Sequence, residues 1–71
     1  MTQVEKVAKY IDEYGSITAL DAMRDLGVMR LASRIADLKN RGYAVVSEIV
    51  AVKNRYGERT YIARYRWEEQ A

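Results

Sequence analysis

The segment that most constrains the fold is residues 30–41, RLASRIADLKNR, which has the periodicity of a helix with two unlike faces. Leu31, Ile35 and Leu38 recur at spacings of four and three residues, so they form a single apolar stripe on an α-helix. Gly42 follows directly, and glycine most readily adopts the left-handed conformation that closes many helices. The pattern predicts a short helix that packs one side on a core and exposes the other.

The exposed side of this predicted helix carries polar side chains suited to nucleic acid. Arg and Asn can pair with the edges of guanine and adenine in the major groove, and such a pair discriminates between bases by about 1–3 kcal/mol. We therefore interpret residues 30–41 as a recognition helix. Its predicted DNA contacts are Arg30, Ser33, Arg34, Asn40 and Arg41.

Two other interpretations of this helix remain open. Its polar side can simply be solvated, and Asp37 favours this because phosphates repel a carboxylate that has no cytosine or arginine to bind. Arg34 lies beside the apolar stripe, so it can instead pair with Asp21 or Asp25 and hold two helices together.

The residue types that the chain lacks exclude several classes of site. With 71 residues it is one small domain, near the lower limit for burying a core without help. Cysteine and histidine are both absent, which excludes disulfides, structural zinc and the usual nucleophile pairs. We therefore expect no enzyme activity, no metal and no cofactor. No apolar run suggests a membrane span or a secretory signal, so the expected location is the cytoplasm.

The net charge of +2 hides an uneven distribution of charge along the chain. Residues 1–29 hold three basic and five acidic side chains, residues 30–66 hold nine basic and three acidic ones, and the last five residues add two glutamates. A basic second half behind an acidic first half favours a protein that binds a polyanion through one face. Ordinary scatter of surface charge is the alternative.

A first helix is predicted over residues 2–14, where apolar side chains recur at helical spacing. Thr2 and Glu5 have the spacing of a capping box, and Gly15 marks the end. We interpret this helix as a scaffold element. The connection after it, residues 15–17, is expected to be a short stub of extended chain.

A second helix is predicted over residues 18–26, with Thr18 as its N-cap and Gly27 as its end. Two short helices joined by a few residues that include glycine are typical of a helix-turn-helix, so this helix and residues 30–41 form that motif. The buried edge of the second helix is predicted to be Leu20, Met23 and Leu26.

After Gly42 the periodicity changes to that of strands. Residues 43–53 are rich in Val, Ile and Tyr, and residues 59–67 alternate apolar and polar side chains. Asn54 and Gly57 between them are residues that turns favour, so the two strands form a hairpin. The side facing the core is predicted to consist of Val45, Ile49, Ala63, Tyr65 and Trp67.

The hairpin directly follows the predicted recognition helix, as a wing does. Its tip region carries Lys53, Arg55 and Arg59, which we predict to contact phosphates or to enter the minor groove. The alternative is that these charges only keep the exposed strands from pairing with other chains. The whole pattern predicts an α+β fold, mainly α, with three helices before a two-stranded antiparallel hairpin, in a single domain of residues 1–71.

The order of these elements is that of winged helix-turn-helix domains, and the chain resembles a family of small helix-turn-helix proteins common in phages and prophages. The residues that carry the resemblance are Ile17-Thr18, Ala22, Leu26-Gly27-Val28, Arg30-Leu31-Ala32-Ser33-Arg34-Ile35, Leu38, Arg41-Gly42-Tyr43 and Ala63-Arg64-Tyr65-Arg66-Trp67. Trp67 stands where the family usually has an aliphatic residue. These residues are mostly core and caps, so the resemblance implies the fold directly and DNA binding by analogy.

Together these observations favour a sequence-specific double-stranded DNA-binding protein, a phage-type transcriptional regulator or repressor. One module of this size covers only a few base pairs, so a homodimer on a two-fold site is expected. Two alternatives remain open. One is an excisionase-like architectural role in recombination. The other is a protein-interaction module, a winged-helix inhibitor or adaptor whose basic face docks on an acidic groove of a host or phage protein.

Overall fold

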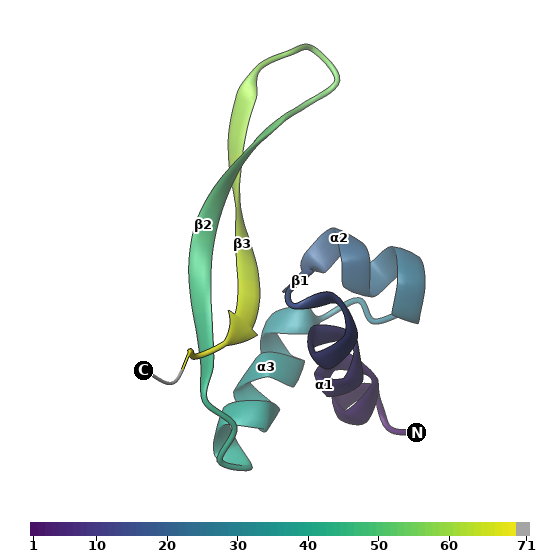
Figure 1. Cartoon of the computed structure of the whole chain (residues 1–71). Helices are drawn as coiled ribbons and strands as arrows, with labels where there is room; N and C mark the ends of the chain where they lie inside the picture. Colours follow the sequence, from purple (N-terminus) through teal and green to yellow (C-terminus); the bar gives the residue numbers. More distant parts are fainter. Residues whose placement is uncertain (70–71) are drawn as a thin grey trace.

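The helices of the chain pack together and a long hairpin extends beyond them (Figure 1). In the computed structural model, which describes residues 1–69, the elements in order are α1 (Gln3–Tyr14), β1 (Ile17–Thr18), α2 (Ala19–Asp21), the π-helical turn η1 (Ala22–Leu26), α3 (Leu31–Asn40), β2 (Val45–Lys53) and β3 (Arg59–Trp67). The predicted order of helices followed by a hairpin is confirmed. The last two residues of the predicted domain, 70–71, lie outside the described residues.

Polar side chains fix where the first two helical segments begin. The hydroxyl of Thr2 accepts a hydrogen bond from the backbone N–H of Glu5 at 3.1 Å, the first bond of the capping box predicted there. The hydroxyl of Thr18 accepts one from the Asp21 N–H at 3.2 Å, and the Asp21 carboxylate accepts from the Thr18 N–H at 3.0 Å. Gly15 closes α1 in the left-handed conformation, with φ of 88°.

The second helix differs from the single α-helix predicted for residues 18–26. It is α-helical over α2 and then widens into the π-type turn η1. Gly27, with φ of 68°, ends this turn and donates its N–H to the carbonyl oxygens of Ala22 and Met23. Val28 follows and is only 1% exposed. The connection to α3 is therefore anchored in the core by Val28.

The sheet has three strands, so the prediction of a two-stranded hairpin alone is wrong. Strand β1 pairs antiparallel with β3, with Ile17 opposite Tyr65 and Thr18 opposite Arg64, and β3 pairs along its length with β2. A strand of two residues is too short to show alternation in the sequence. Its pairing attaches the base of the hairpin to the helices, because β1 leads directly into α2.

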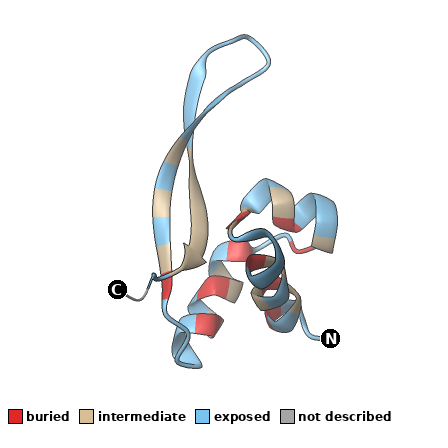
Figure 2. Cartoon of the chain, in the orientation of Figure 1, coloured by how far each residue is buried: buried red, intermediate tan, exposed pale blue. Residues whose placement is uncertain are grey.

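The core lies where α1, α3 and the base of the hairpin meet (Figure 2). Its buried residues, none more than 7% exposed, are Val4, Val7, Ile11, Ile17, Ala22, Val28, Leu31, Ile35, Leu38 and Val45. The apolar stripe predicted for residues 30–41 is therefore the buried face of α3. Because this face is held against α1 and the sheet, the opposite face of α3 is turned outward.

The hairpin extends past the helices, and this overturns one prediction about its core-facing side. Val45 is buried, and Tyr65 and Trp67 pack against the core, but Ile49 is 68% exposed. Alternation along a strand shows which residues share a face, and it does not show how far the layer covering that face extends. The outer part of β2 and β3 is exposed on both sides (Figure 2).

Candidate nucleic-acid interface

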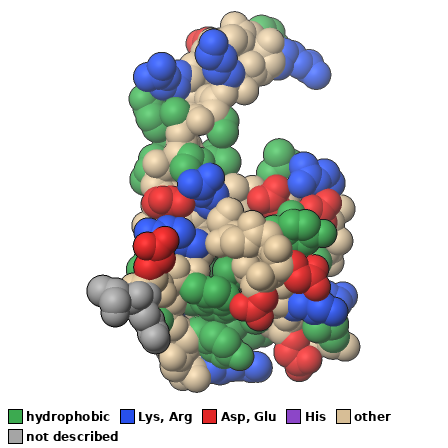
Figure 3. Space-filling view, viewed as in Figure 1, with side chains coloured by type: hydrophobic (Ala, Val, Ile, Leu, Met, Phe, Trp, Pro, Cys, Tyr) green, Lys and Arg blue, Asp and Glu red, His purple; other side chains and the backbone are tan. Residues whose placement is uncertain are grey.

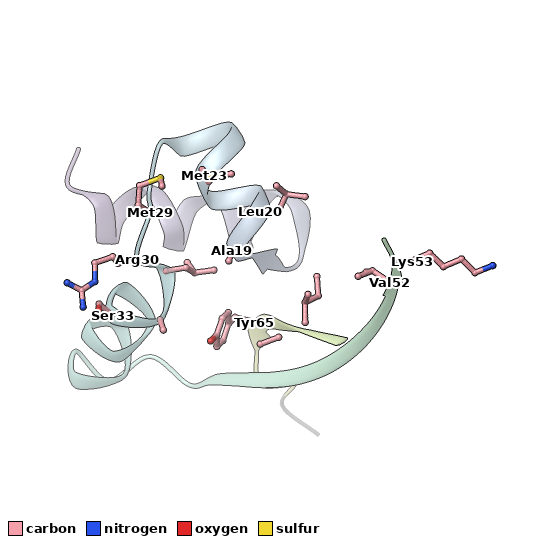
Figure 4. Close-up of a pocket in the computed structure, with 13 residues that line it drawn as sticks. Ala19, Leu20, Met23, Met29, Arg30, Ser33, Val52, Lys53 and Tyr65 are labelled. Carbon is pink, nitrogen blue, oxygen red and sulfur yellow. The ribbon is translucent and has the colours of Figure 1, made fainter. Parts of the chain in front are cut away.

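An open groove of about 940 Å³ lies between the start of α3, the α2–η1 segment and the hairpin (Figure 4). Ala32 and Ser33 of the first α3 turn line it, together with Arg30, the N-cap residue of that helix. No side chain of the described residues caps the N-terminus of α3. The first backbone N–H groups of this helix therefore remain available to an acceptor such as a phosphate.

Cations lie at the two ends of this groove and apolar side chains lie between them. Arg30 and Lys53 extend in opposite directions, away from its centre (Figure 4). Between them lie Leu20, Met23 and Met29, which are 57%, 45% and 72% exposed. Among the residues that the structure describes, none that lines the groove is acidic. The groove therefore combines an apolar centre with positively charged ends.

Sequence reasoning missed this apolar centre. Leu20 and Met23 were assigned to the buried edge of the second helix, and that assignment is wrong for both. Leu26, the third residue of that edge, is half-buried and packs against the core. The residues of this helix that reach the core are Ala22, which is fully buried, and Leu26, four positions further on. The small side chain of Ala22 lies closest to the core, so the larger Leu20 and Met23 are left on the groove side.

Arg34 does not pair with Asp21 or Asp25, the alternative considered from the sequence. Its Nε lies 3.6 Å from Oδ2 of Asp37, one turn further along the same helix. This Nε is buried and forms no hydrogen bond with the described residues. Arg34 is also not among the residues that line the groove. Arg34 is therefore better placed to form an ion pair within α3 than to contact a ligand in the groove.

Asn40 and Arg41 lie at the end of α3 far from the groove. Asn40 is the last residue of the helix and Arg41 is its C-cap, and both are exposed. A helix of 10 residues is about 15 Å long at 1.5 Å per residue. The structure therefore separates these two predicted contacts from Arg30 and Ser33 at the start of the helix.

Three cations gather at the tip of the hairpin, where Figure 3 shows Lys and Arg side chains on an otherwise thin projection. Lys53 and Arg59 lie directly opposite each other in the β2–β3 register, and Arg55 lies in the turn between them. Within residues 1–69 none of the three forms an ion pair. Like charges opposite each other destabilise a sheet, so this arrangement costs stability unless an anion is bound nearby.

Asn54 holds the turn at this tip in shape. Its side-chain oxygen accepts hydrogen bonds from the backbone N–H groups of Tyr56 at 2.9 Å and of Glu58 at 3.0 Å. Gly57 takes φ of 77°, a conformation that residues with a side chain avoid. The two predicted turn residues, Asn54 and Gly57, are thus confirmed. Together they fix the backbone that carries the three cations.

At the base of the hairpin one carboxylate neutralises two arginines. Arg64 Nε donates to Glu48 Oε1 at 2.9 Å, and Arg66 Nε lies 3.7 Å from Glu48 Oε2. The hydrogen bond from Arg64 holds the pKa of Glu48 below its ordinary value, against a smaller opposing effect of desolvation. The positive charge left unpaired on the hairpin is therefore concentrated at its tip.

The acidic residues of the second helix bind internal partners. Arg24 donates to Asp21 Oδ1 at 3.1 Å and to Asp25 Oδ1 at 2.9 Å, while the Tyr10 hydroxyl donates to Asp25 Oδ2 at 2.7 Å. The hydrogen bond from Arg24 lowers the pKa of Asp25, and the bond to Asp25 raises the pKa of Tyr10. This network joins α1 to η1, and neither carboxylate lines the groove.

Comparison with known proteins decides the family. A family model described as winged helix-turn-helix domain matches residues 2–69. The chain belongs to this family. Neither the curated proteins nor the solved structures give a match. Membership confirms the predicted fold family, and it indicates DNA as the partner of this winged helix-turn-helix domain.

In this winged helix-turn-helix domain the hairpin has the position of the wing, and α3 has the position that the recognition helix takes in helix-turn-helix proteins. Five of the predicted contacts lie at the two ends of one groove: Arg30 and Ser33 at the start of α3, and Lys53, Arg55 and Arg59 at the wing tip. Lys53 joins the two parts, because it lines the groove and also faces Arg59 at the tip. The remaining predicted contacts are Arg34, Asn40 and Arg41, which lie outside this set.

The cationic side chains of this surface are suited to binding anions. Guanidinium and ammonium groups can hold phosphates, and the Arg30 guanidinium can also pair with a guanine edge. Within residues 1–69 no group of three or more His, Cys, Asp or Glu side chains is placed to hold a metal ion. In the same part of the chain, no helix has both the length and the apolar character needed to cross a membrane.

Proposed function

We propose that this winged helix-turn-helix domain binds double-stranded DNA in a sequence-specific manner, as a transcriptional regulator of the phage or prophage type. It acts in the cytoplasm, by binding and not by catalysis. The observation that carries the proposal is the cluster of cations at the wing tip, in which Lys53 and Arg59 face each other without a counter-ion among the described residues, together with Arg30 at the other end of the same groove. A polyanion relieves that repulsion, and the phosphates of a duplex supply one.

The roles of the residues follow from their positions. The first turn of α3 enters the major groove, where Arg30 and Ser33 reach base edges. The wing tip binds phosphates or the adjacent minor groove through Lys53, Arg55 and Arg59. Arg34, paired with Asp37 one turn further along α3, stabilises the helix itself. Asn40 and Arg41, at the other end of the helix, contact the flanking backbone.

Selection of bound sequences from random duplexes tests this proposal. The wild-type protein is expected to recover a short motif. Arg30→Ala should loosen that motif at one position, because it removes a base contact. Arg34→Ala should weaken binding about equally at all positions, because it disturbs the helix. Lys6→Ala, on α1 and outside the groove, serves as a control and should recover the wild-type motif unchanged. Failure to recover any motif would contradict sequence-specific binding.

A second copy of the chain is part of the proposal, since one module of this size reads only a few base pairs. Two copies on a two-fold site would give a palindromic motif in the same selection. Sedimentation of the protein with the selected duplex measures the stoichiometry. A non-palindromic motif with one protein per duplex would contradict the dimer and leave DNA binding intact.

The apolar centre of the groove favours a second candidate function, a protein-interaction module. Exposed apolar side chains gathered in one groove can mark a contact surface, and Leu20, Met23 and Met29 all line this groove while exposed. In that case the basic ends of the groove would pair with acids on the partner. Retention on random duplex DNA in dilute salt, followed by release in concentrated salt, distinguishes the first candidate from this one.

A further inference from the structure

The proposed function does not by itself explain why the groove has apolar side chains between its two cations. A cation stands at each end, and the side chains between them are apolar. Phosphate binding uses the ends alone. The three most exposed apolar side chains of the centre, Leu20, Met23 and Met29, need a partner surface that is apolar as well.

A DNA major groove has the complementary order of groups. Phosphates run along its two rims, which are about 12 Å apart, and base edges form its floor. The C5-methyl of thymine is the only apolar group that those base edges present. An apolar side chain on the floor therefore gains contact area from thymine and from no other base.

We propose that the apolar centre of this groove contacts thymine methyl groups, so that the protein prefers duplexes with thymine facing the start of α3. This inference rests on the proposed function, because it specifies which duplexes the same surface binds. Met29 directly precedes Arg30, the N-cap of α3, and Ala32 is the second residue of that helix; both are exposed and line the groove. They lie beside Arg30, whose guanidinium can reach a base edge or a phosphate of the nearer rim, while Lys53 lies toward the opposite rim.

Charge complementarity favours a duplex over a protein as the occupant. The described residues that line the groove include two cations and no acid. The groove also continues through Lys53 into the wing tip, where Arg55 and Arg59 have no ion-pair partner among residues 1–69. A polyanion such as a duplex can neutralise the cations of the groove and those of the wing tip at once. An apolar peptide with acidic ends would neutralise only the cations of the groove.

Replacing thymidine by deoxyuridine tests the inference, because it removes only the methyl group and leaves the charge and hydrogen-bonding groups of the duplex unchanged. Binding is measured on two pools of short random duplexes, one made with thymidine and one with deoxyuridine, and then on the selected duplex with single replacements. The deoxyuridine duplexes should bind more weakly, by about fourfold for each contacted methyl removed. Duplexes bound equally well in both forms would overturn the inference and leave DNA binding intact, whereas loss of binding to both pools would overturn both proposals.

Two single variants show whether the groove is responsible. Met29→Ala should bring the ratio of thymidine to deoxyuridine affinity close to one, because it removes the side chain that contacts the methyl. Ile49→Ala is the matched control, since Ile49 is 68% exposed but does not line the groove, and it should keep the wild-type ratio. An unchanged ratio in Met29→Ala would overturn the assignment to this side chain. Loss of self-association in Met29→Ala, with both kinds of duplex bound alike by the wild type, would overturn the inference and assign the groove to a second copy instead.

Discussion

The indole N–H of Trp67 donates a hydrogen bond to a carboxylate oxygen of Asp12 at 2.7 Å, and this bond joins the end of the wing to the first helix. The Trp67 ring also stacks on Tyr43, with the ring centroids 5.3 Å apart. In the family that the chain resembles, this position is usually aliphatic. Here the end of the wing therefore has a polar attachment to α1 in addition to its apolar packing against the core.

Trp67→Phe should lower the free energy of unfolding by about 0.5–1.5 kcal/mol, the typical net contribution of one hydrogen bond. Phenylalanine keeps an aromatic ring that can stack on Tyr43. Much of the loss of stability therefore comes from removing the indole N–H group. Urea unfolding measures the change. Asp12→Ala should have little further effect when it is added to Trp67→Phe, because the two substitutions remove the same bond. Fully additive losses in the double variant would show that the bond contributes nothing.

Thr18→Ala should destabilise the protein by about 1 kcal/mol, the usual cost of losing an N-cap. Thr18 has both bonds of the capping box with Asp21, and its strand also pairs with β3. Thr60→Ala is the control, because Thr60 is exposed on the wing and its variant should unfold at nearly the wild-type urea concentration. Equal midpoints for the two variants would contradict the role of the cap.

Removing Lys53 and Arg59 together should lower the salt dependence of duplex binding by about two units of slope in a plot of log K against log salt. Each of these cations is expected to release about one counterion when it binds a phosphate. The matched double variant Lys6→Ala, Lys9→Ala, on α1, removes the same charge from another part of the surface and should leave the slope near the wild-type value. An identical slope in all three proteins would contradict phosphate binding by the wing tip.

Asn54→Ala separates the shape of the wing tip from its charge. The variant loses both hydrogen bonds that the Asn54 side chain accepts from the tip backbone, and it keeps every cation. Affinity for the duplex should therefore fall several-fold, because more conformational freedom is lost on binding. The salt slope should stay unchanged. A lower salt slope in Asn54→Ala, with its affinity for the duplex unchanged, would contradict this role of Asn54.

Glu48 gives stability a dependence on pH. Its pKa in the folded protein is lowered from 4.5, mainly by the hydrogen bond from Arg64, so the carboxylate stabilises the fold above that value and the contribution is lost as the pH falls through the folded-state pKa. Glu48→Gln should be less stable than wild type at neutral pH, and the difference should shrink on acidification. Thermal unfolding over this pH range measures it. A difference that grows in acid would contradict the assignment.

Local chemistry was sufficient to predict most of the helix boundaries. Thr2, Gly15, Thr18 and Gly27 act as caps through bonds within a few residues, and such bonds depend on nearby sequence alone. The wing turn at residues 54–58 is likewise held by hydrogen bonds between residues two and four positions apart. For this reason both ends of α1, both ends of the second helix and the position of the wing tip could be placed before the structure was known.

Features that depend on distant packing could not be predicted in this way. Strand β1 exists because Ile17 pairs with Tyr65 and is fully buried, and two residues carry no periodic pattern. The exposure of Ile49 depends on how far the helices cover the sheet. The apolar groove requires the α2–η1 segment, α3 and the hairpin to meet, and that arrangement depends on packing between residues far apart in the sequence.

The most direct test of the central claim is the affinity of the wild-type protein for random duplex DNA, measured by fluorescence anisotropy at a series of salt concentrations. The cationic surface from Arg30 to the wing tip predicts clear binding in dilute salt and a steep, linear fall of log K with log salt, with a slope of roughly three to five units for four or five phosphate contacts. A protein that fails to bind duplexes in dilute salt, or whose affinity does not change with salt, would contradict the account.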